Sequence, residues 1–267
     1  MPELPEVETI ARNLRPELLG KSILAADLLW SRSLATPGPK EFKEQIVGQQ
    51  IKEVGRRAKY LHFKLSRDHL FVHLRMSGDL YTKAGNPAPQ KHDRLMIFLS
   101  GDSVLVFNDT RKFGRVWLVR EPAEVVAHLG PEPLSDEFTV QTFYATLQSR
   151  HRQLKPLLLD QNFLAGMGNI YTDEALHMAG LHPQVSSDTL NLKQVEELWD
   201  AIRAVLGEGI RRNGSSIDWV YRGGDFQNEF QVYQRTGEPC YQCQTPIERI
   251  TVGQRGTHFC PNCQPGD

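Results

Sequence analysis

The chain of 267 residues has no long apolar run, no cysteine before residue 240 and almost no net charge. No segment approaches the ~18 consecutive apolar residues of a membrane-spanning helix, so the sequence predicts no membrane partner. A secretory signal would begin with a charged segment and then an apolar one, but here Pro2 and Glu3 follow Met1. These absences predict a globular protein of the cytoplasm.

The net charge is only −1, but charge is unevenly distributed along the chain. Basic residues gather at 56–59, 111–115, 150–152 and around Arg255. Acidic residues gather in two segments that we expect to be helical, 121–137 and 194–208. A neutral protein with one basic face still binds phosphates there. Composition alone favours scattered surface charge, so nucleic-acid binding needs support from other features.

The four cysteines all lie near the end of the chain, as Cys240-x2-Cys243 and Cys260-x2-Cys263. This spacing is typical of a tetrahedral zinc site made of two knuckles joined by a short hairpin. The alternative is two disulfides in a secreted protein, which the missing signal segment disfavours. We therefore expect one structural Zn²⁺ per chain, and a terminal segment that folds around it.

The beginning of the chain has candidate residues for covalent catalysis. If Met1 is removed, Pro2 presents a secondary amine; an α-amino group has a reference pKa of ~8, so roughly a tenth is neutral at pH 7. Such an amine attacks an electrophilic carbon and forms a Schiff base. Glu3 is the adjacent candidate acid or base. The alternative is a proline in the first helical turn, followed by acids that suit the helix dipole.

Hydrophobic periodicity divides the chain into regions of different structure. Apolar residues recur at helical spacing from Val7 to Leu18, and Gly20 is a natural end for this helix. Pro16 should bend the helix or end it early. From about 22 to 120 the period is two, which predicts an antiparallel β-sandwich. Beyond the linker at 130–133 we expect helices near these ranges: 139–149, 155–164, 170–179 and 191–212.

Several motifs resemble those of bacterial formamidopyrimidine-DNA glycosylases. They are, besides the cysteine knuckles, Pro-Glu-Leu-Pro-Glu (2–6), Gly-Arg-Arg-Ala-Lys-Tyr-Leu (55–61), Gly-Met-Gly-Asn-Ile-Tyr (166–171) and Gln-Arg-Gly-Thr-His-Phe-Cys (254–260). They follow the family's order between residues 1 and 264. The resemblance implies an α+β multidomain protein with three parts. These are an N-terminal antiparallel β-sandwich with flanking helices (1–130), a helix–two-turn–helix DNA-binding domain (131–225) and a four-cysteine zinc-finger hairpin (226–267).

The resemblance also implies an activity and roles for individual residues. The enzyme would excise oxidised purines from duplex DNA and then cleave the strand, with Pro2 attacking C1′ and Glu3 moving protons. Lys59 would assist near the lesion, and Arg255 would hold phosphate between the zinc knuckles. Once the damaged nucleotide is flipped out of the stack, other residues would fill the gap or contact DNA: Met76, His92, Arg111, Phe113, His151 and Asn169.

Some positions depart from the family pattern, and two other functions remain open. Lys112 replaces a frequent second arginine, and His151 stands where a DNA-contacting lysine is expected, so Arg150 or Arg152 could take that role. The loop from Ser216 to Phe226, which covers the flipped base in the family, is short here. The alternatives are an endonuclease VIII-like glycosylase for oxidised pyrimidines and a non-catalytic zinc-ribbon DNA-binding protein. The expected partner is duplex DNA with oxidised bases or abasic sites, bound by a monomer in the bacterial nucleoid.

Overall fold

The computed structural model describes residues 1–216 and 223–266. These residues form two compact units, the first built on Met1–His128 and the second on Leu129–Ser215 together with the residues from Gly224 onward. The zinc-finger segment belongs to the second unit. The three-part division at 130 and 225 stays a prediction. Within the described residues, no helix is long and apolar enough to cross a membrane.

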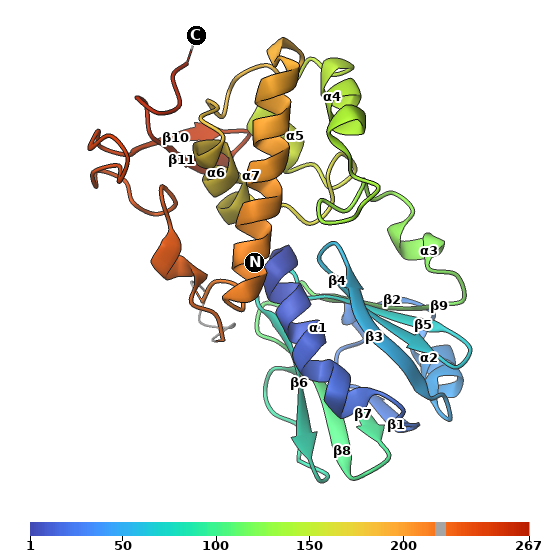
Figure 1. Ribbon diagram of the computed structural model, residues 1–267. Coiled ribbons are helices and arrows are strands. Elements are labelled where there is room, and N and C mark those ends of the chain that lie inside the picture. Colours follow the sequence, from blue (N-terminus) through green and yellow to red (C-terminus); the bar gives the residue numbers. More distant parts are fainter. Residues whose placement is uncertain (217–222, 267) are drawn as a thin grey trace. The chain divides into compact units, whose positions relative to one another are not determined.

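The first unit is a β-sandwich with flanking helices (Figure 1). Its helices are α1 (Leu4–Leu18), α2 (Pro39–Ile46) and α3 (Ala123–Val126). Its strands are β1 (Ile23–Leu28), β2 (Leu34–Thr36), β3 (Ile51–Arg57), β4 (Tyr60–Leu65), β5 (His69–His73), β6 (Gly78–Ala84), β7 (Asp93–Leu99), β8 (Ser103–Asp109) and β9 (Arg115–Val119). The predicted β-sandwich is confirmed.

The strands pair into two sheets, one of four strands in the order β1-β7-β8-β6 and one of five in the order β2-β9-β5-β4-β3. The pairs are antiparallel, with one exception that the alternation did not predict: β2 runs parallel to β9. The predicted alternation of apolar residues decides which side chains of each strand enter the core. Leu61 and Phe63 of β4 and Leu70 and Val72 of β5 are buried between the layers, and their neighbours point to the other face.

Helix α1 contributes one apolar side to the sandwich core. Its buried residues Val7 and Leu14 join the same cluster as the inner faces of both sheets. We expected Pro16 to bend this helix or to end it early; the early end is not found, because α1 continues to Leu18. Pro16 lies in the last turn, where only one backbone hydrogen bond is lost, and the fully buried Leu18 offsets that loss.

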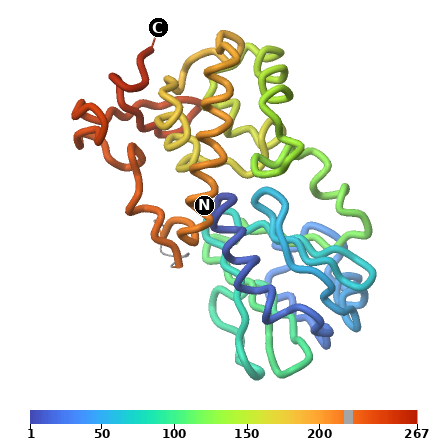
Figure 2. The backbone as a smooth tube through the Cα atoms, in the orientation of Figure 1, coloured from blue at the N-terminus to red at the C-terminus, as the bar shows by residue number. Residues whose placement is uncertain are grey.

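The second unit is helical and ends in a hairpin, as Figure 2 traces from yellow-green through yellow and orange to red. Its elements are α4 (Val140–Gln148), α5 (Leu154–Leu158), α6 (Asn169–Met178), α7 (Leu192–Arg211), β10 (Glu248–Val252) and β11 (Arg255–Phe259). Helix α7 begins at the capping residue Asn191, whose side chain accepts from the Gln194 N–H at 3.0 Å. Helix α6 packs against both α7 and β11, so the hairpin rests on the helical domain.

Two helices predicted from the sequence are shorter in the structure. The segment 121–137 forms only α3, because Gly130, Pro131 and Pro133 prevent a longer helix. The helix expected over 155–164 ends at Leu158, and turns follow that are closed by the Asp160 carbonyl accepting from the Phe163 N–H at 2.9 Å. The loop from Ser216 to Phe226 lies largely outside the described residues.

Candidate active site and zinc centre

Pro2 and Glu3 lie at the N-terminus of α1, and both are buried. The Glu3 backbone N–H donates to the Glu6 carboxylate at 2.7 Å, which fixes the entry of the chain into the helix. Peptide dipoles make this end of the helix electropositive, and that favours a carboxylate here. The candidate nucleophile and the candidate acid–base group therefore stand side by side on one rigid element.

Lys59 lies in the tight turn between β3 and β4, where Ala58 has a positive φ of 52°. Only 5% of Lys59 is exposed, unlike an ordinary lysine at a strand end. The next residue, Tyr60, pairs across the sheet with His73, and their rings meet edge-on at 4.7 Å. The turn therefore places a largely buried lysine next to the residue that pairs with the end of β5.

His73 is a buried residue that the sequence did not single out. Burial, followed by the charges of Arg75 and Lys59, lowers the pKa of His73 to about 3. The ring is therefore neutral at physiological pH, and its Nδ1 accepts the Arg75 N–H at 3.0 Å. A neutral acceptor beside Lys59 fixes the backbone that leads to Met76.

Two turns of the sandwich place exposed side chains together. We name residues 75–77, between β5 and β6, the Met76 tip, and residues 111–113, between β8 and β9, the Arg111 tip. Met76 is 47% exposed and Phe113 is 55% exposed, so neither is a core residue. The Arg111 guanidinium donates to the Met76 sulfur at 3.6 Å, which brings the tips side by side. An apolar chain, a planar donor and an aromatic ring thus share one exposed site.

Further cations lie around the Arg111 tip. The Lys112 ammonium stands 4.0 Å from the centre of the Trp30 ring, and the Arg32 guanidinium lies over the same ring at 5.7 Å. Lys112 and Arg32 are exposed. His92 is half-buried, with its Nδ1 3.4 Å from the Arg94 guanidinium. This surface of the first unit presents positive charge next to the tips.

In the second unit, buried polar groups hold the turn that carries Arg255. The Gly256 carbonyl accepts from Asn169 Nδ2 at 2.9 Å and from Lys155 Nζ at 3.1 Å. Lys155 is fully buried and pairs with Asp173 at 2.6 Å. The other Asp173 oxygen accepts the His258 N–H at 2.9 Å. Asn169, at the start of α6, is thus bonded to the residue that follows the exposed Arg255, while its Oδ1 is buried and has no hydrogen-bond partner among the residues that the structure describes.

His151 faces an acid rather than standing alone. Its Nδ1 lies 2.6 Å from the Asp188 carboxylate, and its side chain is largely exposed. Arg152 likewise pairs with Asp160 at 2.8 Å, and Arg150 is exposed. Since each of these acids offsets part of the neighbouring positive charge, the segment attracts phosphate less strongly than three basic residues would.

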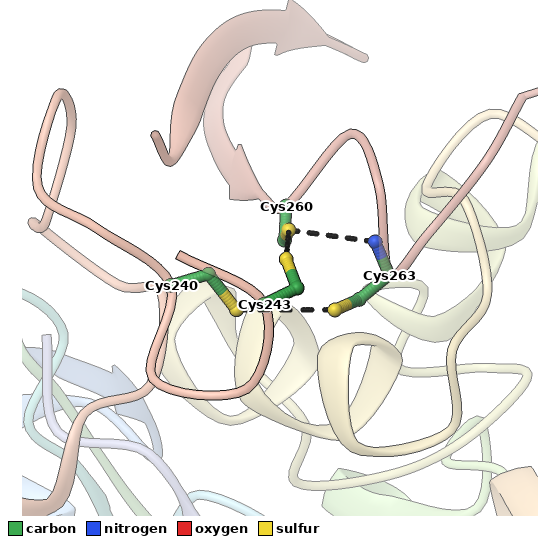
Figure 3. Close-up of side chains that lie close together, drawn as sticks. All are labelled: Cys240, Cys243, Cys260 and Cys263. Atoms are coloured by element: carbon green, nitrogen blue, oxygen red, sulfur yellow. Dashed lines mark hydrogen bonds between the residues drawn. The ribbon is translucent and has the colours of Figure 1, made fainter. Parts of the chain in front are cut away.

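The four cysteines converge from two turns, as Figure 3 shows. All four sulfur atoms lie within 4.8 Å of one another; Cys240 and Cys263 are 3.9 Å apart, and Cys243 and Cys260 are 3.4 Å apart. Tetrahedral zinc with Zn–S bonds of ~2.3 Å needs sulfur atoms about 3.8 Å apart, so the cluster fits this ion. Four thiolates complete the coordination, which is the donor set of a structural site.

Comparison with known proteins identifies the family to which the chain belongs. Family models match in three places: the formamidopyrimidine-DNA glycosylase N-terminal domain over residues 1–116, its H2TH domain over 129–220, and a zinc finger found in FPG and IleRS over 237–266. A formamidopyrimidine-DNA glycosylase of Chloroflexus aggregans is 47% identical, over 99% of this chain and 98% of its own. The chain belongs to the formamidopyrimidine-DNA glycosylase family.

Solved structures of family members agree along the whole chain. A structure of MutM in complex with DNA containing carbocyclic 8-oxo-G has a TM-score of 0.92 and 38% identity. A mutant of Lactococcus lactis FPG with DNA containing Fapy-dG has a TM-score of 0.93 and 37% identity. Each alignment covers 99% of this chain and 100% of the other.

The sequence did not indicate four residues that hold neighbouring segments in place: His73, Asp109, Lys155 and Asp173. All are buried. The sequence does not show which partner each of these residues meets across the fold. Asp109 alone had a visible signal, since it opens the Asp-Thr-Arg-Lys-Phe-Gly segment that carries the Arg111 tip.

Proposed function

We propose that this protein is a bifunctional DNA glycosylase and abasic-site lyase that removes oxidised purines, 8-oxoguanine and formamidopyrimidines, from duplex DNA. The observation that carries the proposal is full-length similarity to family members bound to such DNA, in a chain with Pro2 and Glu3 together at one helix N-terminus. The family's three recognised parts are all present in this chain.

The chemistry begins when removal of Met1 exposes the Pro2 amine. The nitrogen attacks C1′ of the flipped nucleotide, the glycosidic bond breaks, and the base leaves with a proton. The sugar ring opens and leaves an iminium between Pro2 and C1′. Because the iminium accepts electrons, it permits β-elimination of the 3′ phosphate and then δ-elimination of the 5′ phosphate. Glu3 protonates and deprotonates the sugar. Hydrolysis of the iminium releases the amine.

Other residues bind and orient the DNA. Lys59 supplies a positive charge near the reacting sugar, and Arg255 holds a phosphate with a rigid guanidinium. Asn169 and His92 contact the backbone, together with the segment that contains His151. The zinc ion supplies no reaction step; when bound, it fixes the hairpin that carries Arg255. Met76, Arg111 and Phe113 occupy the space that the extruded nucleotide leaves.

Specific features separate this proposal from its two rivals. The complete Met76, Arg111 and Phe113 set favours the purine branch over an endonuclease VIII-like enzyme for oxidised pyrimidines. Retention of Pro2 and Glu3 disfavours a non-catalytic zinc-ribbon protein. We place the enzyme in the bacterial cytoplasm, associated with the nucleoid through its DNA binding and acting as a monomer.

Borohydride trapping tests the proposal directly. The mass of the purified protein should show that Met1 is absent, and borohydride should then link the protein to duplex DNA that contains 8-oxoguanine opposite cytosine. Pro2→Gly should weaken the adduct. An undiminished adduct after the N-terminal amine is blocked would show that Pro2 is not the nucleophile.

A further inference from the structure

Asp109, the last residue of β8, connects the two tips through its side chain. Its carboxylate is almost fully buried. One oxygen accepts the Ser77 hydroxyl at 2.5 Å and the Arg111 N–H at 3.2 Å, and the other accepts the Gly114 N–H at 2.7 Å. A single carboxyl group thus holds the Met76 tip at Ser77, and it holds the Arg111 tip at Arg111 and at Gly114, the residue that follows the tip.

The backbone of Asp109 holds a third segment. Its N–H donates to the His92 carbonyl at 2.9 Å, and its own carbonyl accepts from Arg94 Nε at 2.7 Å. The DNA-contacting groups proposed for the first unit at Met76, His92 and Arg111 are therefore all tied to this one residue. Hydrogen bonds to a carboxylate are roughly twice as strong as neutral ones, and the side chain of Asp109 accepts the three that hold the tips.

The turn that follows Asp109 is too closely packed to adopt another conformation easily. A Cβ on Gly114 would lie 2.4 Å from the Phe107 ring and 3.2 Å from the Asp109 carboxylate. A Cβ on Gly78, at the end of the other turn, would lie 2.4 Å from the Leu74 carbonyl oxygen. Close backbone approach keeps each turn in place. The separation between the tips is then set by the Asp109 hydrogen bonds, together with the Arg111 N–H, which also donates to Ser77 Oγ at 3.1 Å.

We propose that Asp109 is a positioning residue that keeps the two tips in register, so that Met76 and Phe113 enter the gap in DNA together while Arg111 faces the orphaned base. This inference rests on the proposed function. The contact between Arg111 and the Met76 sulfur is its visible consequence. Without the shared carboxylate each tip keeps its own turn, but only the bond from the Arg111 N–H to Ser77 Oγ and the contact with the Met76 sulfur still join the tips, so their separation is less well fixed.

Asp109→Asn tests this with little change in volume, because an amide nitrogen replaces one of the two acceptor oxygens. Asp79→Asn is the matched control: Asp79 lies in β6 of the same sheet and accepts the N–H of its own neighbour, Leu80, at 2.9 Å. Ser77→Ala is the second variant, since it removes the Ser77 hydroxyl that bonds to Asp109 and to the Arg111 N–H, and keeps the bond from Gly114 to Asp109. Thermal unfolding shows which variants are folded.

Two DNA substrates distinguish a positioning role of Asp109 from a role in the chemical steps. On duplex DNA, Asp109→Asn should lower excision of 8-oxoguanine on the order of 100-fold and reduce the preference among the four opposite bases. Borohydride trapping on single-stranded DNA with an abasic site, where there is no gap to fill, should match wild type. Ser77→Ala should show the same pattern more weakly, and Asp79→Asn should behave as wild type.

Three results would contradict the role of Asp109. One is a folded Asp109→Asn protein with wild-type duplex excision and opposite-base preference. Another is a parallel loss on single-stranded abasic DNA, which indicates general damage to the enzyme. If Asp109→Asn does not fold, wild-type behaviour of Ser77→Ala overturns the proposal. Failure of the wild-type protein itself to form any trapped adduct refutes the proposed function instead, so the two failures are distinguishable.

Discussion

The two units hold their proposed DNA-contacting residues in different ways. In the first, Met76 and Arg111 stand on sandwich turns that are joined by hydrogen bonds to Asp109. In the second, Arg255 stands on a two-stranded hairpin next to four cysteines. A sandwich has a large apolar core that supports its turns, whereas a short hairpin has little core of its own. We infer from this difference that a metal ion and a buried ion pair stabilise the hairpin in place of the apolar core that it lacks.

Loss of the metal should have the largest effect, and only on the second unit. Cys243→Ser removes one thiolate, and structural zinc contributes about 10–16 kcal/mol of apparent binding energy in small zinc fingers. We expect less than one bound zinc per chain and a strong loss of DNA affinity. Metal analysis and DNA-binding titrations measure both, with Ser100→Ala, in a turn of the sandwich, as the control. Full affinity in a verified zinc-free protein would contradict the comparison.

The largest effect within the first unit should come from Glu3→Gln. The variant keeps the shape of the side chain but cannot exchange protons, and general acid–base groups contribute about 10²–10⁴-fold to rate. Single-turnover release of 8-oxoguanine should fall by this order, while DNA affinity stays near wild type. Glu17→Gln, at the exposed end of the same helix, serves as the control. Unchanged base release would remove Glu3 from the mechanism.

Lys155→Met should test the buried pair that supports the hairpin. The substitution leaves the Asp173 carboxylate buried without its cation, and breaking such a pair costs about 3–5 kcal/mol. Denaturant unfolding of the zinc-loaded protein should show this loss. Lys193→Met is the control, because its exposed pairing with Glu197 at 3.7 Å contributes ~0–1 kcal/mol. Equal stability of the two variants would mean that zinc alone fixes the hairpin.

Sequence reasoning predicted the sandwich and the zinc ligands for physical reasons. The alternation at Leu61 and Phe63 reports burial directly, because side chains on a strand alternate between faces. The spacing of the cysteines reports their shared ligand, because two knuckles are local structures. Both signals lie within short stretches of chain, so no long-range contact was needed to find them.

The sequence could not predict the residues that join distant segments. Asp109 meets Ser77, and Lys155 meets Asp173 and Gly256, across long sequence separations that leave no periodic trace. Of the bend or early end expected at Pro16, the early end is not found for a related reason, since tertiary burial of Leu18 outweighs a local preference. The proposed roles of the DNA-contacting residues rest on family resemblance and stay predictions.

Arg111→Ala should have a smaller and more specific effect. If Arg111 faces the orphaned base, its loss should reduce discrimination among opposite bases by ~1–3 kcal/mol. Affinity titrations on DNA with each of the four bases opposite the lesion measure this. Arg67→Ala, an exposed residue of another turn in the same unit, should leave discrimination intact. An equal loss of affinity for all four bases would show that Arg111 contacts only phosphate.

The smallest expected effect concerns Lys112, and it asks how a protein of net charge −1 holds DNA. Each phosphate that a cation neutralises releases counterions, so the logarithm of affinity falls with the logarithm of salt by about 0.9 per contact. Lys112→Ala should make this slope shallower by about one unit and leave base preference unchanged. Trp30→Ala should lower affinity with the slope unchanged, because it removes the ring beneath Lys112 but not the charge. Lys40→Ala, a largely exposed helix lysine, is the control. An unchanged slope for Lys112→Ala would mean that its ammonium stays on Trp30 and does not reach phosphate.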